Sequence, residues 1–360
     1  MLSEGTTGAE EPYMRIADRR IGAGEAPFII AELSGNHGGS LQRALATVDA
    51  IAAAGADALK LQTYTAETMT LDIDRSEFTI DDPESLWVGR TYFDLYNEAH
   101  TPWEWHEPLF KRARERGLIA FSSPFDVTAV DLLVGLGAPC LKIASFEITD
   151  LPLIRHAAEA GLPMILSTGM ATRDEIEAAI DAARSAGCSD LALLWCTSAY
   201  PARADAANLK GMVDLREWSG MEVGISDHTV GSAVATAAVA LGASIVEKHV
   251  TLDRDLATVD GAFSMNPADL SRLVYDTRAA QESLGAILYG PTTQEVGSLR
   301  FRRGLWFVRD LMAGEVIGPS DVRSLRPVAP LPPDAIGGVL GRRVATEVRR
   351  GDPVTLDVLE

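Results

Sequence analysis

Residues 222–250 read EVGISDHTVGSAVATAAVALGASIVEKHV, and this segment gives the clearest indication of the fold. Two short apolar runs, 222–226 and 244–250, flank a helical stretch, which is typical of two parallel strands joined by a helix. Each run leads into a histidine, His228 or His249, and Ser226 and Glu247 share the strand parity of these histidines. Two buried core histidines are the alternative, but the shared parity argues against it. Because barrel enzymes keep their chemistry at the carboxyl ends of strands, the pair predicts half of a metal site.

The same alternation extends over most of the chain. Helical stretches separate the apolar runs, as in 40–54, where Ser40 is expected to cap the helix and Gly55 to end it. Eight strand-and-helix repeats predict a (β/α)8 TIM barrel rather than an open sheet. A dinucleotide site is not expected, because the segment 35–39 after the first run is not G-x-G-x-x-G. The eight apolar runs are 27–33, 57–63, 118–123, 139–144, 163–167, 190–196, 222–226 and 244–250.

The prediction divides the chain into a catalytic barrel domain (1–285), a linker (286–300) and a small C-terminal domain (301–360). The last 60 residues hold nine arginines, no lysine and eight acidic residues, and their Pro and Gly turns predict an irregular β-rich module. Residues 64–117 are too long for one helix and a loop, so an insertion over the barrel mouth is expected there. The alternative is that its tryptophans only fasten the insertion to the barrel.

Composition excludes several function classes. A formal net charge of −19 over 360 residues repels nucleic acid and anionic membrane surfaces. The three cysteines lack zinc-site spacing and are predicted to be buried thiols of a reducing compartment. No apolar run reaches the length of about 20 residues that spans a membrane, and the N-terminus shows no signal-peptide pattern. A cytoplasmic enzyme is therefore expected.

Polar side chains follow the predicted strands and indicate a phosphate-binding site. Lys60 and Lys142 lie inside apolar runs, where lysine is unfavourable, and together with hydroxyl groups they would bind a dianion. Glu32 and Glu147 could move protons or orient water. Two histidines cannot fill a coordination shell, so substrate oxygens or water would complete it, which favours Mn²⁺ or Mg²⁺ acting as a Lewis acid. This set predicts addition of a phosphorylated enol to an aldehyde.

These residues carry a resemblance to a known family. Seven motifs occur in chain order on successive predicted strands, and they resemble the nonulosonic (sialic) acid synthase family over about residues 15–360. The resemblance implies a barrel joined to an antifreeze-like (SAF) domain, a domain-swapped homodimer, and condensation of phosphoenolpyruvate with an open-chain amino sugar, with release of phosphate. The motifs are Ala31-Glu-Leu-Ser-Gly-Asn-His37, Lys60-Leu-Gln-Thr63, Ser123-Pro-Phe125, Lys142-Ile-Ala-Ser-Phe-Glu147, Ser167-Thr-Gly-Met170, Ser226-Asp-His-Thr229 and Glu247-Lys-His249.

Within the family, segments 86–106 and 196–201 resemble the pseudaminic acid synthase branch. The sugar implied is 2,4-diacetamido-2,4,6-trideoxy-β-L-altropyranose. The alternative is an N-acetylneuraminate or legionaminate synthase that uses a mannose-type amino sugar.

The resemblance also implies roles for individual residues. A divalent metal, Mn²⁺ or Mg²⁺ with Co²⁺ as a further alternative, would bind to His228 and His249. Arg326 matches an arginine that reaches into the partner's site, although Val328 stands where the family often has glycine. The phosphate of phosphoenolpyruvate would bind to Lys60, Ser123, Lys142, Ser145, Ser167 and Ser226, and the sugar would lie near Gln62, Ser198, Tyr200 and Asp260.

Two other functions fit parts of the pattern. A class II type aldolase would use the same metal to cleave a phosphorylated sugar, without consuming phosphoenolpyruvate. A carbohydrate-binding or structural protein with an inactive barrel is the other. The presence of Lys60, Lys142 and both histidines argues against the inactive barrel.

Overall fold

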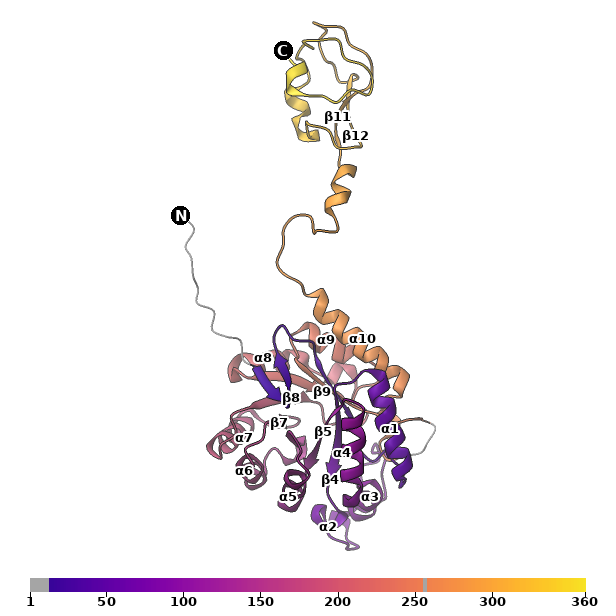
Figure 1. The fold of residues 1–360 in the computed structure, drawn as a ribbon, viewed down its shortest axis with the longest axis vertical. Coiled ribbons are helices and arrows are strands. Elements are labelled where there is room, and N and C mark those ends of the chain that lie inside the picture. The colour runs from indigo at the N-terminus through magenta and orange to yellow at the C-terminus, as the bar shows by residue number, and fades with distance from the viewer. Residues whose placement is uncertain (1–12, 255–257) are drawn as a thin grey trace. The chain divides into compact units, whose positions relative to one another are not determined.

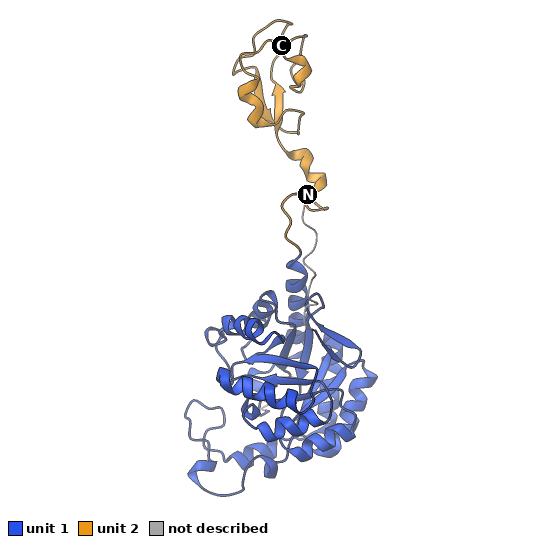
Figure 2. Ribbon diagram, turned by 90° about the vertical axis from the view of Figure 1, so that its left-hand side faces the viewer, with its two compact units in different colours: residues 1–285 blue, residues 286–360 orange. Residues whose placement is uncertain are grey.

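The computed structural model describes residues 13–254 and 258–360. The first twelve residues, on which the expected lack of a signal peptide rests, lie outside the described residues. The chain forms two compact units, of which the first ends at Gly285 and the second comprises Ala286–Glu360 (Figure 2).

Eight parallel strands close into a barrel in the first unit, in which β10 pairs with β3 (Figure 1). The predicted TIM barrel is confirmed, and each strand starts or ends within a few residues of a predicted apolar run. The strands are β3 Phe28–Glu32, β4 Ala58–Thr63, β5 Ile119–Pro124, β6 Leu141–Ile143, β7 Met164–Ser167, β8 Leu191–Cys196, β9 Glu222–Ser226 and β10 Ile245–His249.

Helices surround the barrel and bury one face against it. Helix α1 begins as expected, with Ser40 Oγ accepting a hydrogen bond from Arg43 N, and it ends at Gly55, whose φ of 87° is left-handed. The insertion between β4 and β5 carries the short helices α2 Ala66–Met69 and α3 Tyr92–Ala99. The other helices are α1 Leu41–Ala54, α4 His106–Glu115, α5 Val127–Gly135, α6 Leu151–Glu159, α7 Arg173–Ser185, α8 Leu209–Ser219, α9 Ala233–Ala240 and α10 Pro267–Ser283.

A hairpin that the sequence pattern did not predict precedes the barrel. Strands β1 Tyr13–Ile16 and β2 Arg19–Gly22 are antiparallel, and their apolar side chains pack into the cluster that fills the amino-terminal end of the barrel. That cluster contains side chains from early in the barrel strands, such as Phe28, Ala58 and Ile245. Because this end is filled with apolar side chains, a polar ligand can enter only at the carboxyl ends of the strands.

The third strand lysine, Lys248, lies behind the barrel wall rather than in its interior. Its Nζ donates hydrogen bonds to Asp227 Oδ2 at 3.1 Å and to Thr229 O at 2.5 Å, and the two charged side chains are each 1% exposed. Burial lowers the pKa of Lys248, which Asp227 partly offsets. The pair ties the loop that carries His228 to strand β10.

Replacing Lys248 with Met should lower the free energy of unfolding of the first unit by about 3–5 kcal/mol, because Asp227 would remain buried without its cation. Urea unfolding of the full chain measures this change. Lys210, exposed on α8, supplies the control, since Lys210→Met should stay within about 0.5 kcal/mol of the parent. Equal stabilities of the two variants would contradict the structural role given to Lys248.

The second unit has its own small core. Strands β11 Gly304–Phe307 and β12 Val322–Leu325 are antiparallel, and single bridges such as Leu311–Val348 extend the pairing. Leu305, Phe307 and Val344 are buried in this core. The 3₁₀ helices here are η6 Val296–Phe301, η7 Pro333–Gly338 and η8 Leu356–Val358; those of the first unit are η1 Ser76–Phe78, η2 Trp103–Trp105, η3 Ser145–Glu147, η4 Ala204–Ala206 and η5 Gly261–Phe263.

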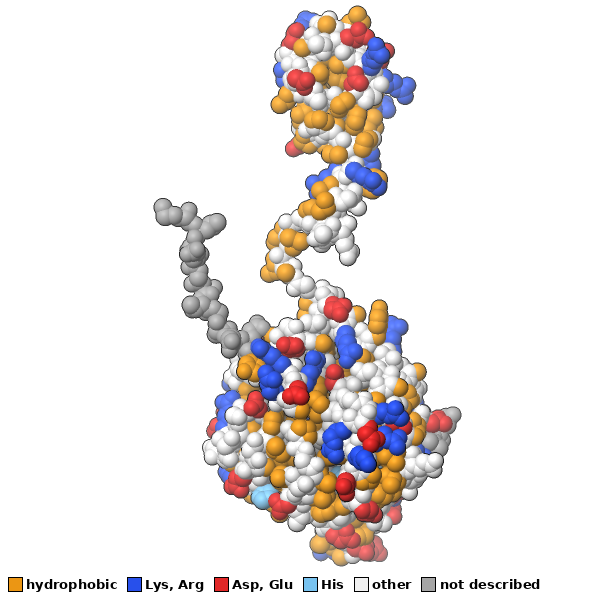
Figure 3. All heavy atoms as spheres, in the orientation of Figure 1, with side chains coloured by type: hydrophobic (Ala, Val, Ile, Leu, Met, Phe, Trp, Pro, Cys, Tyr) orange, Lys and Arg blue, Asp and Glu red, His pale blue; other side chains and the backbone are white. Residues whose placement is uncertain are grey.

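The surface carries both signs of charge. On the face drawn in Figure 3, acidic and basic side chains of the barrel unit lie interspersed with apolar ones. Ion pairs join helices across this surface, for example Arg112 and Arg116 with Asp49 at 2.9 and 2.7 Å. Among the described residues, none of the helices has the length and apolar character needed to cross a membrane.

Candidate active site at the carboxyl ends of the strands

A pocket of about 600 Å³ opens where the barrel strands end. Nearly all predicted site residues line it, and two do not. Ser123 is buried behind the lining, with its Oγ unpaired among the described residues, and Arg326 is an exposed residue of the second unit, directly after β12. The predicted residues that line the pocket are Glu32, Lys60, Gln62, Lys142, Ser145, Glu147, Ser167, Ser198, Tyr200, Ser226, His228, His249 and Asp260.

Two lysines and a glutamate form the base of the pocket. Lys60 Nζ and Lys142 Nζ lie 2.8 and 3.0 Å from the same oxygen, Glu247 Oε1. Ser226 Oγ donates a hydrogen bond to that oxygen at 2.9 Å. Although burial opposes ionisation of Glu247, both lysines outweigh it and hold its pKa well below the usual range. The sequence indicated the parity of Glu247 with His249 but not its role as the shared partner of the lysines.

Glu32 belongs to the same ionic cluster. Its carboxylate accepts hydrogen bonds from Gln62 Nε2 at 2.8 Å and lies 3.0 Å from Lys60 Nζ and 3.2 Å from His249 Nε2. Burial raises the pKa of Glu32, but Lys60 and His249 outweigh it and the net direction is downward. Burial lowers the pKa of Lys60, yet Glu247 and Glu32 reverse this, so the pKa of Lys60 is raised. This cluster therefore keeps Glu32 ionised and Lys60 protonated.

The two histidines at the ends of β9 and β10 face each other, with ring centroids 5.2 Å apart. Burial lowers the pKa of His228 to about 3, so this imidazole is neutral at physiological pH. Its Nδ1 lies 3.1 Å from Thr197 O, an acceptor, which requires the proton on Nδ1 and leaves the lone pair on Nε2. Nδ1 of His249 is buried without a hydrogen-bond partner among the described residues. These two imidazoles fit the role of metal ligands.

The described side chains do not by themselves make up a complete metal site. Within residues 13–254 and 258–360, no three His, Cys, Asp or Glu side chains are arranged as a metal site. Asp260 Oδ2, 3.9 Å from His249 Nδ1, accepts hydrogen bonds from Ser34 Oγ and from Gly35 N. A cation here would therefore depend on His228 and His249 together with oxygen atoms from water or substrate.

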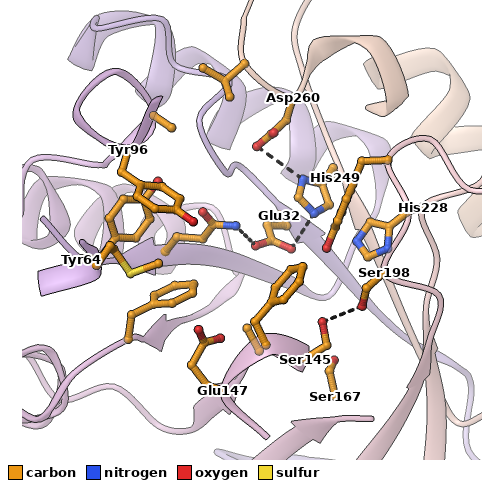
Figure 4. Close-up of a pocket in the computed structure, with 18 of the residues that line it drawn as sticks. Glu32, Tyr64, Tyr96, Ser145, Glu147, Ser167, Ser198, His228, His249 and Asp260 are labelled. Atoms are coloured by element: carbon orange, nitrogen blue, oxygen red, sulfur yellow. Dashed lines mark hydrogen bonds and ion pairs between the residues drawn. The ribbon is translucent and has the colours of Figure 1, made fainter. Parts of the chain in front are cut away.

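Hydroxyl groups line the side of the pocket below the histidines (Figure 4). Ser145 Oγ and Ser198 Oγ are 2.8 Å apart. A Cβ at Gly169 would collide with Ser198 Oγ, so glycine is needed at this position. Ser167 Oγ is buried and has no hydrogen-bond partner among the described residues. These hydroxyls are available to an anion held by the lysines.

Glu147 stands apart from the ionic cluster, on η3 and close to Ser145 (Figure 4). Burial raises its pKa to about 7, which the more distant Lys142 only partly opposes. Its Oε2 is buried without a partner among the described residues. A carboxyl group with a pKa near neutrality can both accept and donate a proton, which suits a general base or acid.

The insertion contributes a wall that the sequence interpretation did not assign residue by residue. Trp87 and Tyr96 line the pocket, and Tyr64 and Leu95 lie beside them. Trp87 Nε1 donates to Val259 O at 3.1 Å, and Trp103 Nε1 donates to Tyr64 O at 3.3 Å. Both sequence interpretations of the insertion therefore hold in part, since Trp87 bonds to Val259, outside the insertion, and also lines the pocket. Its richness in aromatic residues was the available signal.

Comparisons with known proteins agree over most of the chain. The NeuB family model matches residues 47–289, and the SAF domain model matches residues 302–360. The pseudaminic acid synthase of Helicobacter pylori is 40% identical over 93% of this chain and 98% of that protein. The N,N'-diacetyllegionaminic acid synthase of Legionella pneumophila is 36% identical over 92% of this chain and 94% of that protein. The N-acetylneuraminic acid synthetase structure from Leptospira borgpetersenii, in complex with citrate, has a TM-score of 0.72 at 32% identity, over 81% of this chain and 96% of that one.

Proposed function

Because the chain belongs to the NeuB family, we propose that it condenses phosphoenolpyruvate with an amino sugar and releases phosphate. The observation that carries the proposal is the pair of buried ammonium groups on Glu247 Oε1, in one pocket with the unpaired hydroxyl of Ser167. Glu247 and Glu32 balance the charge of the two lysines, and both ammonium groups remain available as charged hydrogen-bond donors to an anionic substrate. Phosphate needs both cations and many donors, and this part of the pocket offers both.

A divalent cation is part of the proposal. His228 and His249 would hold it, because one has a fixed Nε2 lone pair and the other an unpartnered ring nitrogen. When bound, it would act as a Lewis acid on the carbonyl oxygen of the sugar. Mn²⁺ or Mg²⁺ is the preferred ion, with Co²⁺ as an alternative.

The reaction follows from these groups. Lys60, Lys142, Ser145, Ser167 and Ser226 bind the phosphate and hold the enol carbon of phosphoenolpyruvate against the sugar aldehyde. A C–C bond forms between the two carbons, and the aldehyde oxygen takes up a proton. Water adds to the cationic carbon that results and gives up one proton, which leaves a hydroxyl group on that carbon. The C–O bond to phosphate then breaks, the hydroxyl proton leaves with the phosphate, and a 2-keto acid remains.

Of the two carboxylates expected to handle protons, we assign the transfer from water to Glu147. Its pKa of about 7, raised by burial, suits a base at neutral pH, whereas three partners hold Glu32 in its ionised form. Glu32 would instead position Gln62, Lys60 and His249.

We expect kcat to rise with pH through about 7 as Glu147 loses its proton, because only the carboxylate can accept one from water. Glu147→Gln should lower kcat by about 10²-fold or more and remove this rise from the pH profile. Initial rates of phosphate release between about pH 5 and 9 measure both effects. A rise that persists in Glu147→Gln would assign the proton to another group, and a rise confined to low pH would favour Glu32.

The sugar we propose is 2,4-diacetamido-2,4,6-trideoxy-β-L-altropyranose. The identity to pseudaminic acid synthases supports this choice, with legionaminate or N-acetylneuraminate synthesis from a mannose-type sugar as the alternative. Phosphate release with metal, phosphoenolpyruvate and each sugar in turn tests the proposal. Release that depends on the altro sugar supports it; preference for N-acetylmannosamine would overturn the choice of sugar, and no release with any sugar would overturn the condensation itself.

We also propose that the working form is a domain-swapped homodimer of barrel (1–285), linker (286–300) and SAF domain (301–360), with Arg326 reaching the partner's site. The linker supports this, because Ile287 and Tyr289 are 93% and 97% exposed, which is unusual for large apolar side chains. Light scattering of the full chain should give the mass of a dimer, and a monomer active at high dilution would contradict it.

A further inference from the structure

The pocket has two chemically different halves. The charged and hydroxyl-bearing side chains described above lie at the strand ends. The other half is formed by Tyr64, Trp87, Tyr92, Leu95 and Tyr96, which we call the aromatic wall. All five of its members come from the insertion between β4 and β5. In Figure 4, Tyr64 and Tyr96 lie on one side of Glu32, and His228 and His249 lie on the other. A ligand that fills the pocket therefore touches both halves.

The aromatic wall is a packed structure rather than a set of loose side chains. The rings of Tyr64 and Tyr96 meet edge to face at 5.8 Å, and Tyr92 stacks on Tyr96 at 6.2 Å. Trp87 is held by its hydrogen bond to Val259 O and lies 6.3 Å from the ring of Tyr200. Tyr200 in turn lies 4.5 Å from the ring of His228. Packing and hydrogen bonding hold the wall in place, and Tyr200 connects it to His228, one of the two predicted metal ligands.

The wall combines apolar surface with a few hydrogen-bond donors. Among the described residues, the hydroxyls of Tyr64 and Tyr96 have no hydrogen-bond partner, although burial raises the pKa of both groups and keeps them protonated. An acylamino group has a methyl or alkyl end and one carbonyl acceptor, which match an aromatic ring and its hydroxyl. A sugar hydroxyl against Leu95 or the ring of Trp87 would lose its water without gaining a partner.

We propose that the aromatic wall is the specificity site for the sugar, and that it selects a sugar bearing acylamino groups and a deoxy carbon over one bearing hydroxyls at those positions. The inference rests on the proposed condensation and goes beyond it by naming the residues that choose the substrate. Trp87 and Leu95 exclude hydroxyl groups, and Tyr64 and Tyr96 supply donors for acyl carbonyls. The strand-end half binds phosphoenolpyruvate in the same way with either sugar.

The test compares kcat/KM for 2,4-diacetamido-2,4,6-trideoxy-L-altropyranose and for N-acetylmannosamine in the parent, Trp87→Ala and Tyr96→Ala. In each variant the ratio of the two values should fall by at least about tenfold, because loss of apolar contact costs the deoxy, diacylated sugar more. KM for phosphoenolpyruvate should stay within about twofold, since the wall does not touch the lysines. Tyr96→Phe separates the two roles, and it should lose part of the preference while keeping the packing.

Phe93→Ala is the matched control, since Phe93 lies on the same helix, α3, but does not line the pocket. It should leave the ratio unchanged, which separates local contact from disturbance of the insertion. Turnover by the parent with an unchanged ratio in Trp87→Ala and Tyr96→Ala would overturn this inference alone. No phosphate release by the parent with either sugar would overturn the proposed function and this inference with it.

Discussion

Replacing Lys142 with Met is expected to lower kcat/KM for phosphoenolpyruvate by about 10²–10³-fold. Lys142 supplies one of the two ammonium groups on Glu247 Oε1, and its side chain is 2% exposed. Without it, Lys60 would stand alone against Glu32 and Glu247, and the resulting net negative charge would repel the phosphate. The loss should fall mainly on phosphoenolpyruvate, with a smaller effect on KM for the sugar. Initial-rate kinetics with each substrate varied in turn separate the two effects.

Lys111→Met is the matched control, because Lys111 is exposed on α4 and lies outside the pocket. It should keep the parent kinetics. Circular dichroism of Lys142→Met must show the helical content of the parent, so that a lost fold is not mistaken for a lost binding site. A folded Lys142→Met with unchanged KM for phosphoenolpyruvate and unchanged kcat would remove the lysine pair from the phosphate site.

The second large effect is expected for His249→Ala, which should reduce turnover by at least about 10³-fold at ordinary metal concentrations. His249 is one of the two proposed ligands, and its removal also takes away a partner of Glu32. Mn²⁺ binding followed by electron paramagnetic resonance gives a readout independent of turnover, and the affinity should fall with the activity.

His156 provides the control for this substitution. It lies on α6, where its Nε2 is 2.9 Å from Asp131 Oδ1, and it does not line the pocket. His156→Ala should bind Mn²⁺ and turn over like the parent. Retained activity and unchanged Mn²⁺ affinity in His249→Ala would defeat the ligand assignment, and retained affinity with lost activity would make His249 a group that acts on substrate directly.

The barrel could be predicted because its determinants are local. Each strand is a short apolar run, and each is separated from the next by a helical period, so eight repeats indicate a closed parallel barrel. The hairpin β1–β2 could not be predicted in the same way. Its strands have four residues each, and only Met14, Ile16 and Ile21 are apolar and buried. Its stability comes from packing into the end of the barrel, which no local pattern records.

The residues at the strand ends could also be predicted from the sequence, because their positions follow from the predicted barrel. Barrel topology brings the carboxyl ends of all eight strands together, so polar residues at those ends must meet. Parity placed His228 and His249 on the same side of their strands as Ser226 and Glu247, and Lys60 and Lys142 were notable as lysines inside apolar runs. The pairing of both lysines with Glu247 depends on distances across the barrel, between β4, β6 and β10, and a linear pattern does not contain these. Ser123 shows the limit of this argument, because it ends a predicted strand yet is buried and does not line the pocket.

The aromatic wall depends on the path of a long insertion. No periodic pattern predicts which of its side chains face the pocket. Trp87 and Trp103 lie on the same insertion and each donates to a backbone carbonyl, yet Trp87 lines the pocket and Trp103 does not. The family resemblance drawn from the seven motifs is confirmed, and it covers the strand ends from which those motifs come.

The most direct test of the central proposal follows the bridging oxygen of phosphoenolpyruvate. The condensation described above breaks the bond between carbon and that oxygen, so a label of oxygen-18 in the bridge must leave with the phosphate. Mass spectrometry of both products, after turnover with the altro sugar, measures where the label goes. The account predicts labelled phosphate and an unlabelled sugar acid, formed only when the sugar is present. Label in the sugar acid, or phosphate released equally without sugar, would contradict it.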